Sequence, residues 1–298
     1  MILPQLIADG IVAGSTLALG AIGLTMTYDI MRFANFAHGE FLTFAAYFAL
    51  MFVSAFGGVQ TFGPLTFGWT FIVGLIIAVV LTAILALVLD WLIYRPLRRT
   101  NIVITLVIAS FGAELMLRNI AVFFWGSQSR FYSTAISIHR EILPGVRMSA
   151  DDIFLVLLTA VLMILLQLFL TRTQLGKEMR AVSDNADLAR VTGISVRRII
   201  RWVWIIGGGL AAVSGVLVGL TVQISPENGF SLILPLFAAA IVGGIGSIYG
   251  AVAGGLIIGL VESLSVPIMG AQYKLAAAFI VMLVVLLVRP RGIFGAKS

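Results

Sequence analysis

Apolar residues run along the chain in long continuous stretches, separated by short segments that carry most of the charge. A helix needs roughly 20 apolar residues to cross about 30 Å of hydrocarbon, whereas the strands of a membrane barrel alternate apolar and polar residues. The pattern therefore predicts an all-α, polytopic membrane protein. Its nine candidate spans are approximately 5–28, 38–56, 69–93, 101–124, 152–170, 202–222, 231–249, 250–266 and 273–288.

The seventh and eighth spans are the weakest of the nine. They are short and rich in glycine, and Pro235 interrupts the first of them. Eight spans plus a re-entrant segment fit the pattern nearly as well, so we predict eight to nine transmembrane helices. The outer loop, about 126–151, is too short for a second domain, and we expect residues 1–298 to form a single transmembrane domain.

Composition leads to the same class of protein. Of 298 residues, 60% are apolar and 11% are charged, and the mean hydropathy is +1.11. Soluble proteins carry about 25% charged residues, and disordered chains combine high charge with low hydrophobicity, so both classes are excluded. The chain has no cysteine, and its two histidines lie far apart. No spaced ligand set for a metal and no catalytic constellation can be recognised, so we expect neither a metal site nor an enzyme.

The distribution of Lys and Arg predicts the orientation. With the N-terminus outside and the C-terminus inside, fourteen basic residues fall in cytoplasmic segments and four fall outside. This asymmetry follows the positive-inside rule, so the net charge of +6 reflects membrane orientation rather than nucleic-acid binding.

The cytoplasmic segment 171–201 is the most polar part of the chain, with seven basic and three acidic residues. Gly176 and Gly193 divide it, which predicts one or two short amphipathic helices, the second over about 185–191 with Gly193 as its cap. No phosphate-binding loop occurs in the sequence. ATP would therefore have to be bound by another chain, and we expect no cofactor on this one.

Two polar or glycine-rich segments interrupt apolar runs, at 29–40 and 242–250. Interrupted helices in two parts of a membrane protein are typical of a transport pathway, because irregular backbone at membrane depth has to lie against protein or water. Ordinary interfacial turns are the alternative interpretation. If the first holds, the two segments flank one central pathway.

Small residues spaced four apart recur in the spans, as at Gly10 and Gly14 or Gly255 and Gly259. Such pairs let helices approach closely, either within one bundle or between subunits. Among ionisable residues, Glu114 and Arg118 stand one turn apart, which predicts a structural ion pair, with a polar pathway lining as the alternative. Asp90 lies close to Arg95 and is predicted to be interfacial.

Several motifs together resemble one family. Asn35-Phe-Ala-His-Gly-Glu40, the basic turn Tyr94-Arg-Pro-Leu-Arg98, the stretch Asp187-Leu-Ala-Arg-Val-Thr-Gly193 and the late Gly243-Gly-Ile-Gly-Ser247 occur in that order. This series resembles the permeases of branched-chain amino acid ABC importers (LivH type), nearly end to end. Tyr249 departs from the proline that many relatives carry there.

The resemblance implies an inner-membrane subunit of a bacterium or archaeon. Its partners would be a second homologous permease, two cytoplasmic ATPase subunits, a periplasmic substrate-binding protein and membrane lipid, without nucleic acid. The residues expected along the translocation path are Asn35, His38, Gly39, Glu40, Gly243, Gly244, Gly246 and Ser247. Those expected to couple to the ATPase are Arg180, Asp187, Leu188, Ala189, Arg190 and Gly193.

Two other functions stay open at this point. Urea and short-amide importers share this permease family, and a stand-alone secondary transporter or channel would work without partners. Segment 171–201 separates the classes, since only an ATP-driven importer needs a cytoplasmic helix that docks on an ATPase. The alternative for this segment is electrostatic anchoring to anionic lipid, at roughly 1 kcal/mol per basic residue.

Overall fold

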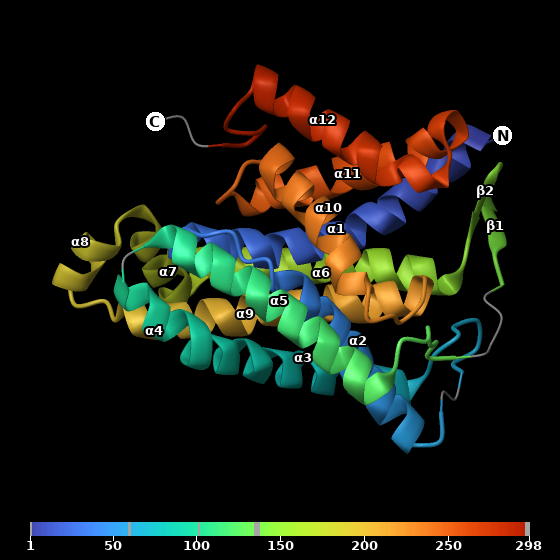
Figure 1. Ribbon diagram of the computed structural model, residues 1–298. Helices are drawn as coiled ribbons and strands as arrows, with labels where there is room; N and C mark the ends of the chain where they lie inside the picture. The colour runs from blue at the N-terminus through green and yellow to red at the C-terminus, as the bar shows by residue number, and fades with distance from the viewer. Residues whose placement is uncertain (1, 59–60, 101, 134–137, 296–298) are drawn as a thin grey trace.

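The computed structural model describes residues 2–58, 61–100, 102–133 and 138–295, and it shows a bundle of long helices (Figure 1). Within these residues, eight helices are long and apolar enough to cross a membrane, and the 16-residue α10 is shorter. This confirms the prediction of eight to nine spans. Asn101, at the start of the fourth predicted span, and Lys297, counted among the inner basic residues, lie outside the described residues, as does part of the outer loop. The main helices of the bundle are α1 (Ile2–Met31), α2 (His38–Ala55), α3 (Trp69–Leu89), α5 (Val103–Trp125), α6 (Ala150–Arg172), α9 (Val196–Thr221), α10 (Asn228–Gly243), α11 (Ile248–Met269) and α12 (Lys274–Val288).

Short elements occupy the two ends of the bundle. The inner end, which bears the predicted cytoplasmic segments, carries α7 (Gln174–Asp184) and α8 (Ala186–Val191). There α3 continues through a π-helical turn (Asp90–Tyr94) into α4 (Arg95–Leu97) and a 3₁₀ turn (Arg98–Thr100). At the outer end, β1 (Arg140–Leu143) and β2 (Val146–Met148) form an antiparallel hairpin in the outer loop, and a 3₁₀ turn (Ala271–Tyr273) precedes α12.

Helix α1 lies between α11 and α9 and forms the centre of the core. Its Gly10 and Gly14 face Gly255 and Gly259 of α11, where the two backbones touch. A Cβ atom on Gly259 would overlap the backbone of Gly14. Of the two interpretations of these small-residue pairs, the structure therefore shows packing within one bundle.

A buried polar network joins the inner ends of α3 and α9. The Asp90 carboxylate accepts a hydrogen bond from the Trp204 indole N–H (2.8 Å) and forms an ion pair with Arg98 (2.6 Å). Tyr94 stacks on Trp204, and its hydroxyl donates to the Asn35 side chain (2.9 Å). Asp90 therefore has Arg98 and Trp204 as its partners, and only tertiary packing could bring Trp204 to it, while its place at the membrane interface stays a prediction.

The α1–α11 contact can be tested at a single glycine. Gly259→Ala should lower the melting temperature of the purified protein in detergent, because overpacking costs about 1–3 kcal/mol. Gly112→Ala in α5 is the matched control, since apart from its chain neighbours and the backbone of its own helix no atom lies within 4 Å of the added methyl. It should leave the melting temperature unchanged or raise it, because alanine favours helix by about 1 kcal/mol over glycine. Equal melting temperatures for the two variants would contradict the close contact.

Candidate functional site

The two interrupted segments meet at the inner end of the bundle. The Gly246 backbone N–H donates to the Thr25 hydroxyl (3.3 Å), and Gly246 also lies against the Asp29 carboxylate. Together with α6 and α7 they enclose a cavity of about 630 Å³, the inner cavity. Its polar lining includes Asp29, Arg32, Gln167, Arg180, Ser183, Asp184, Ser247 and Tyr249.

The chain turns back into the bundle after α1. Helix α2 starts beside Gly20 and Gly23, with His38 Nε2 3.0 Å from the Gly20 carbonyl oxygen. That level is two turns, about 12 Å, before the end of α1. The irregular backbone between the helices is satisfied by Ser110 of α5, which accepts from the Phe36 N–H (3.2 Å) and donates to the Ala34 carbonyl (3.2 Å). The structure therefore confirms a discontinuous segment at 32–37.

The residues around the start of α2 that were expected along the translocation path lie inside the protein. Asn35, His38 and Glu40 are fully buried, and none of them lines the inner cavity. Gly39 touches the backbone of Gly229, which lets α2 and α10 approach closely. Asn35 and His38 therefore act in the packing of this conformation, while any part they take in transport stays a prediction.

The late glycine segment forms a tight hairpin between α10 and α11. Gly243 packs on the backbone of Gly250, and Gly244 has φ +105°, a conformation that favours glycine. The C-terminal segment covers this turn, since the Phe294 N–H donates to the Gly243 carbonyl (2.9 Å). Only Gly246 and Ser247 of the four late residues line the inner cavity, and Ser247 also caps α11.

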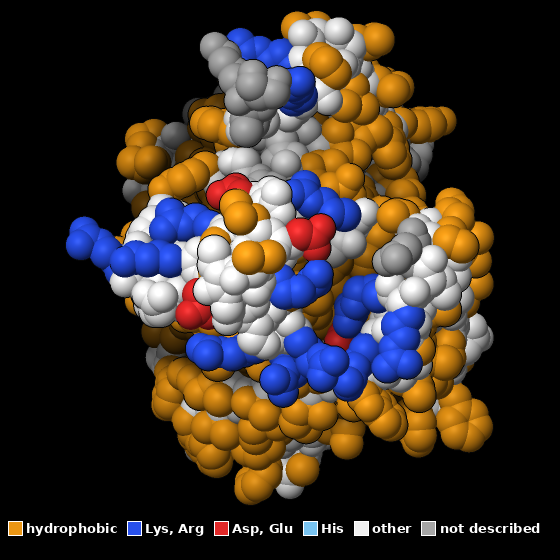
Figure 2. Space-filling view, turned by 90° about the vertical axis from the view of Figure 1, so that its left-hand side faces the viewer, with side chains coloured by type: hydrophobic (Ala, Val, Ile, Leu, Met, Phe, Trp, Pro, Cys, Tyr) orange, Lys and Arg blue, Asp and Glu red, His pale blue; other side chains and the backbone are white. Residues whose placement is uncertain are grey.

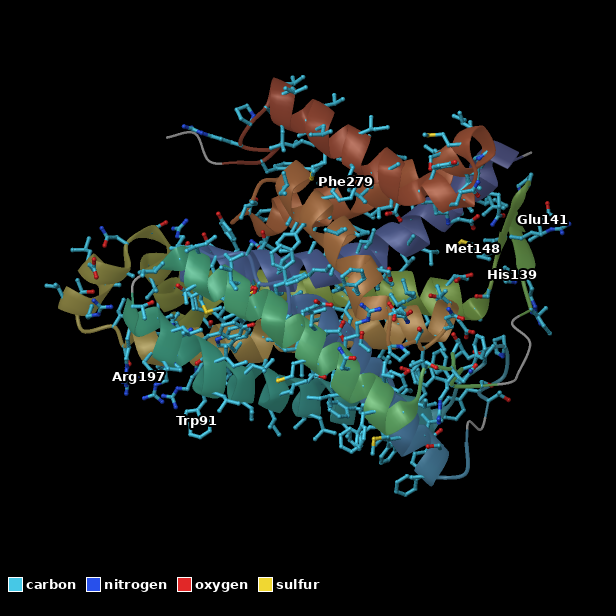
Figure 3. All side chains as sticks on the ribbon, in the orientation of Figure 1. Trp91, His139, Glu141, Met148, Arg197 and Phe279 are labelled. Carbon is cyan, nitrogen blue, oxygen red and sulfur yellow. The ribbon has the colours of Figure 1, made fainter. Side chains whose placement is uncertain are left out.

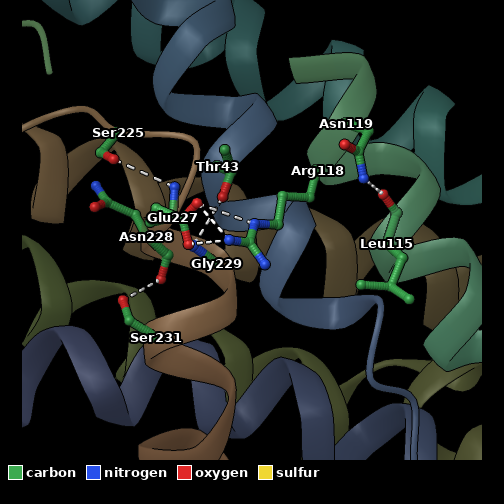
Figure 4. Close-up of polar contacts among 9 residues, drawn as sticks. All are labelled: Thr43, Leu115, Arg118, Asn119, Ser225, Glu227, Asn228, Gly229 and Ser231. Atoms are coloured by element: carbon green, nitrogen blue, oxygen red, sulfur yellow. Dashed lines mark hydrogen bonds and ion pairs between the residues drawn. The ribbon is translucent and has the colours of Figure 1, made fainter. Parts of the chain in front are cut away.

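A second polar group, the acidic cluster, lies where α2, α5 and the start of α10 meet, and it consists of Glu40, Glu114, Arg118 and Glu227. Arg118 forms an ion pair with Glu227, with its Nε 3.2 Å from Oε1 (Figure 4). The predicted ion pair between Arg118 and Glu114 is therefore wrong. Although the two residues stand one turn apart on α5, the start of α10 brings a more exposed carboxylate to the guanidinium.

Glu114 and Glu40 occupy the interior of this cluster. Among the described residues, none donates a hydrogen bond of normal geometry to the Glu114 carboxylate, which is buried. Glu40 is also buried, beside Thr43 and within electrostatic range of Glu114 and Arg118. A carboxylate at membrane depth without a partner is costly and is a candidate for function by default.

An aromatic cluster lies on the same side, where α5 and α10 meet. Phe36 packs edge-on against Phe111 (6.0 Å between ring centres) and tilted against Phe237 (5.2 Å). Nearer the outer end, the Arg118 guanidinium lies 4.9 Å above the ring of Phe230. Sequence reasoning missed Glu227 and these rings, because each of them sits in a separate span or loop and only the fold assembles them.

The cytoplasmic segment 171–201 has the predicted helices. The Asn185 side chain caps α8 by accepting from the N–H groups of Asp187 and Leu188, and Gly193 ends the turn with φ +89°. Leu188 (63%) and Val191 (85%) are exposed, whereas Ala189 is buried at 4%. The expectation that Ala189 offers an apolar contact to a partner is wrong, since it faces the body of the protein. Arg180 is exposed, and Arg190 pairs with Asp187 (2.9 Å).

Comparison with known proteins identifies the class. The family model described as "Branched-chain amino acid transport system / permease component" matches residues 6–288. The chain belongs to this family. No solved structure matches it.

The permease is similar to its relatives over almost its whole length. It is 35% identical to the high-affinity branched-chain amino acid transport system permease protein BraD of Pseudomonas aeruginosa, over 98% of this chain and 95% of that protein. It is 34% identical to the corresponding protein LivH of Escherichia coli K12, with the same coverage. A probable LivH of Methanocaldococcus jannaschii is 31% identical, over 98% of this chain and 92% of that protein. The chain is thus a multi-pass inner-membrane permease, and not an enzyme.

The Arg118–Glu227 pair predicts the outcome of charge exchange. Arg118→Glu or Glu227→Arg alone should reduce the yield of folded permease, because each puts like charges together beside Glu40 and Glu114. The double exchange Arg118→Glu, Glu227→Arg should recover most of the yield measured by size-exclusion chromatography. The control exchange, Arg118→Glu with Glu114→Arg, should recover little of the yield. If only the control exchange recovered the yield, the ion pair predicted from sequence, Glu114 with Arg118, would be the correct one.

Proposed function

We propose that this permease is the membrane subunit of an ATP-driven importer for branched-chain amino acids. A second homologous permease, two cytoplasmic ATPase subunits and a periplasmic substrate-binding protein would complete the importer. The observation that carries the proposal is the similarity, over nearly the full length, to permeases named for that transport in two bacteria and an archaeon. The sequence has no phosphate-binding loop, so ATP belongs to the partner subunits and this chain needs no cofactor.

The acidic and aromatic clusters match the chemistry of such a substrate. A branched-chain amino acid carries an ammonium group, a carboxylate and an aliphatic side chain. The carboxylates of Glu114 and Glu227 suit the ammonium group of the amino acid, and the Arg118 guanidinium suits its carboxylate. The rings of Phe36 and Phe237 suit its aliphatic side chain. The interrupted segment 29–40, which the sequence predicts to flank the path, contributes Phe36 to this surface.

This surface is open on one side, which supports a paired permease. The side chain of Glu227 is 57% exposed, and Phe111 and Phe230 are exposed as well. Exposed charge at membrane depth is unfavourable against lipid. A second permease facing α5 and α10 would cover these groups and complete a pathway between the two subunits.

Helix α8 is suited to dock on an ATPase subunit. Asn185 caps its start at the inner end of the bundle, and its exposed face combines Leu188 and Val191 with the charges of Asp187 and Arg190. An apolar centre with a charged rim is typical of a protein interface. Simple anchoring to lipid would require the charges alone.

The assembly can be tested by co-expression with the ATPase subunits, second permease and binding protein encoded beside it. The complex should co-purify, and in liposomes leucine with the binding protein should stimulate ATP hydrolysis several-fold. Urea and short amides serve as control solutes. Stimulation by urea alone would assign the permease to the other importers of its family, and amino-acid flux through liposomes containing only this chain would contradict an ATP-driven importer.

Docking through α8 predicts a specific loss of coupling. Leu188→Asp should abolish leucine transport and either release the ATPase or leave its hydrolysis independent of substrate, because it puts a charge in the apolar centre of the contact. Leu188→Met, the matched control, should keep normal coupling. Normal coupled transport by Leu188→Asp would favour lipid anchoring.

A further inference from the structure

A basic pocket opens at the inner end of the bundle, between the end of α3 and the start of α9. It encloses about 1070 Å³. Figure 2 shows Lys and Arg side chains gathered across this end, next to the apolar surface of the membrane helices. The arginines that line the pocket are Arg95, Arg98, Arg99, Arg190, Arg197 and Arg201.

Most of this charge has no counterpart among the residues that the structure describes. Asp90 is the acidic residue of the lining, and it is already engaged by Arg98 and Trp204. Arg190 pairs with Asp187. Within the described ranges, no carboxylate forms an ion pair with Arg95, Arg99, Arg197 or Arg201. Four guanidinium groups held around one pocket repel each other, and an anion between them would relieve that repulsion.

The walls of the pocket are fixed before any ligand arrives. The Asp90–Trp204 hydrogen bond and the stacking of Tyr94 on Trp204 join α9 to the π-helical turn that precedes Arg95. Arg98 is held on Asp90 at 2.6 Å. The floor of the pocket is therefore fixed by packing, and the exposed side chains of Arg99, Arg197 and Arg201 surround it.

The pocket continues into an apolar, exposed face of α3. Trp91, on its rim, is 65% exposed and points away from the bundle (Figure 3). Exposed Val88, Ile84, Val80 and Ile76 follow it along α3 toward the outer end. A tryptophan at this position is typical of a membrane–water interface. The site thus offers arginines to an anionic head and an apolar stripe to a hydrocarbon tail.

We propose that this pocket binds the headgroup of an anionic phospholipid from the cytoplasmic leaflet, with its acyl chains along α3. Guanidinium forks match phosphate oxygens in geometry and charge. A free phosphate would not use the apolar stripe, and an acidic segment of a protein partner would not need a site at the edge of the lipid-facing surface. The proposal is independent of which solute the permease carries.

The test uses the full-length permease in detergent and titrates it with brominated phosphatidylglycerol, which quenches tryptophan fluorescence on contact. Brominated phosphatidylcholine and inorganic phosphate are the comparison probes. We expect phosphatidylglycerol to quench at least tenfold more effectively than phosphatidylcholine, and Trp91→Phe to remove most of that difference. Inorganic phosphate at millimolar concentration should not displace the lipid.

Two matched triple variants separate this pocket from general surface charge. Arg99→Gln, Arg197→Gln, Arg201→Gln removes three exposed pocket arginines, whereas Arg140→Gln, Arg147→Gln, Lys274→Gln removes three exposed charges at the outer end. The first should lose roughly fivefold in phosphatidylglycerol affinity for each arginine removed. The second should bind as the unaltered protein does, and both should elute as folded protein.

Three results would overturn the proposal. They are equal quenching by the neutral and anionic lipids, displacement by inorganic phosphate alone, and equal loss of affinity in the two triple variants. In the assembled importer, cross-linking from Arg99→Cys should capture lipid. Capture of an ATPase subunit would assign the pocket to that partner and would overturn it as well.

Discussion

Irregular backbone at membrane depth has to find its hydrogen-bond partners inside the protein, and the arrangement of this permease depends on that constraint. Residues 32–37 leave the helical ladder beside the core, and Ser110 of α5 supplies both a donor and an acceptor to them. Helix α5 must therefore lie against the break. That position brings Phe111 to Phe36 and Glu114 to Glu40, so one backbone requirement assembles both clusters of the candidate pathway.

Small residues make such an arrangement possible. Where α2 meets α10 and where α10 turns into α11, glycine faces glycine, and the helix axes come closer than side chains would allow. The resulting hairpin reaches back to Thr25 and Asp29 at the end of α1. The two breaks in the spans thus form one structural unit at the inner end.

Charge is divided between two tasks at that inner end. The α7–α8 segment presents a mixed surface in which Arg190 is matched by Asp187, as suits a contact with another protein. A short distance away, the arginines around the start of α9 are largely unmatched and border the lipid-facing surface of α3. The sequence assigned all of this positive charge to membrane orientation. In the structure the charge is divided between these two distinct surfaces.

The sequence by itself determined the features that depend on neighbouring residues. Continuous apolar runs located the spans, the interruptions near Asn35 and Gly244 located the two breaks, and Gly193 located the end of α8. The tertiary structure decided which groups meet across helices: Arg118 pairs with Glu227 instead of Glu114, Asp90 is buried under Trp204, and Ala189 faces inward. An apolar run, a glycine or a helix cap acts on residues close to it in the sequence. The partner of a charged side chain depends instead on which helix lies beside it, and the neighbouring helix is set only when all the helices pack together.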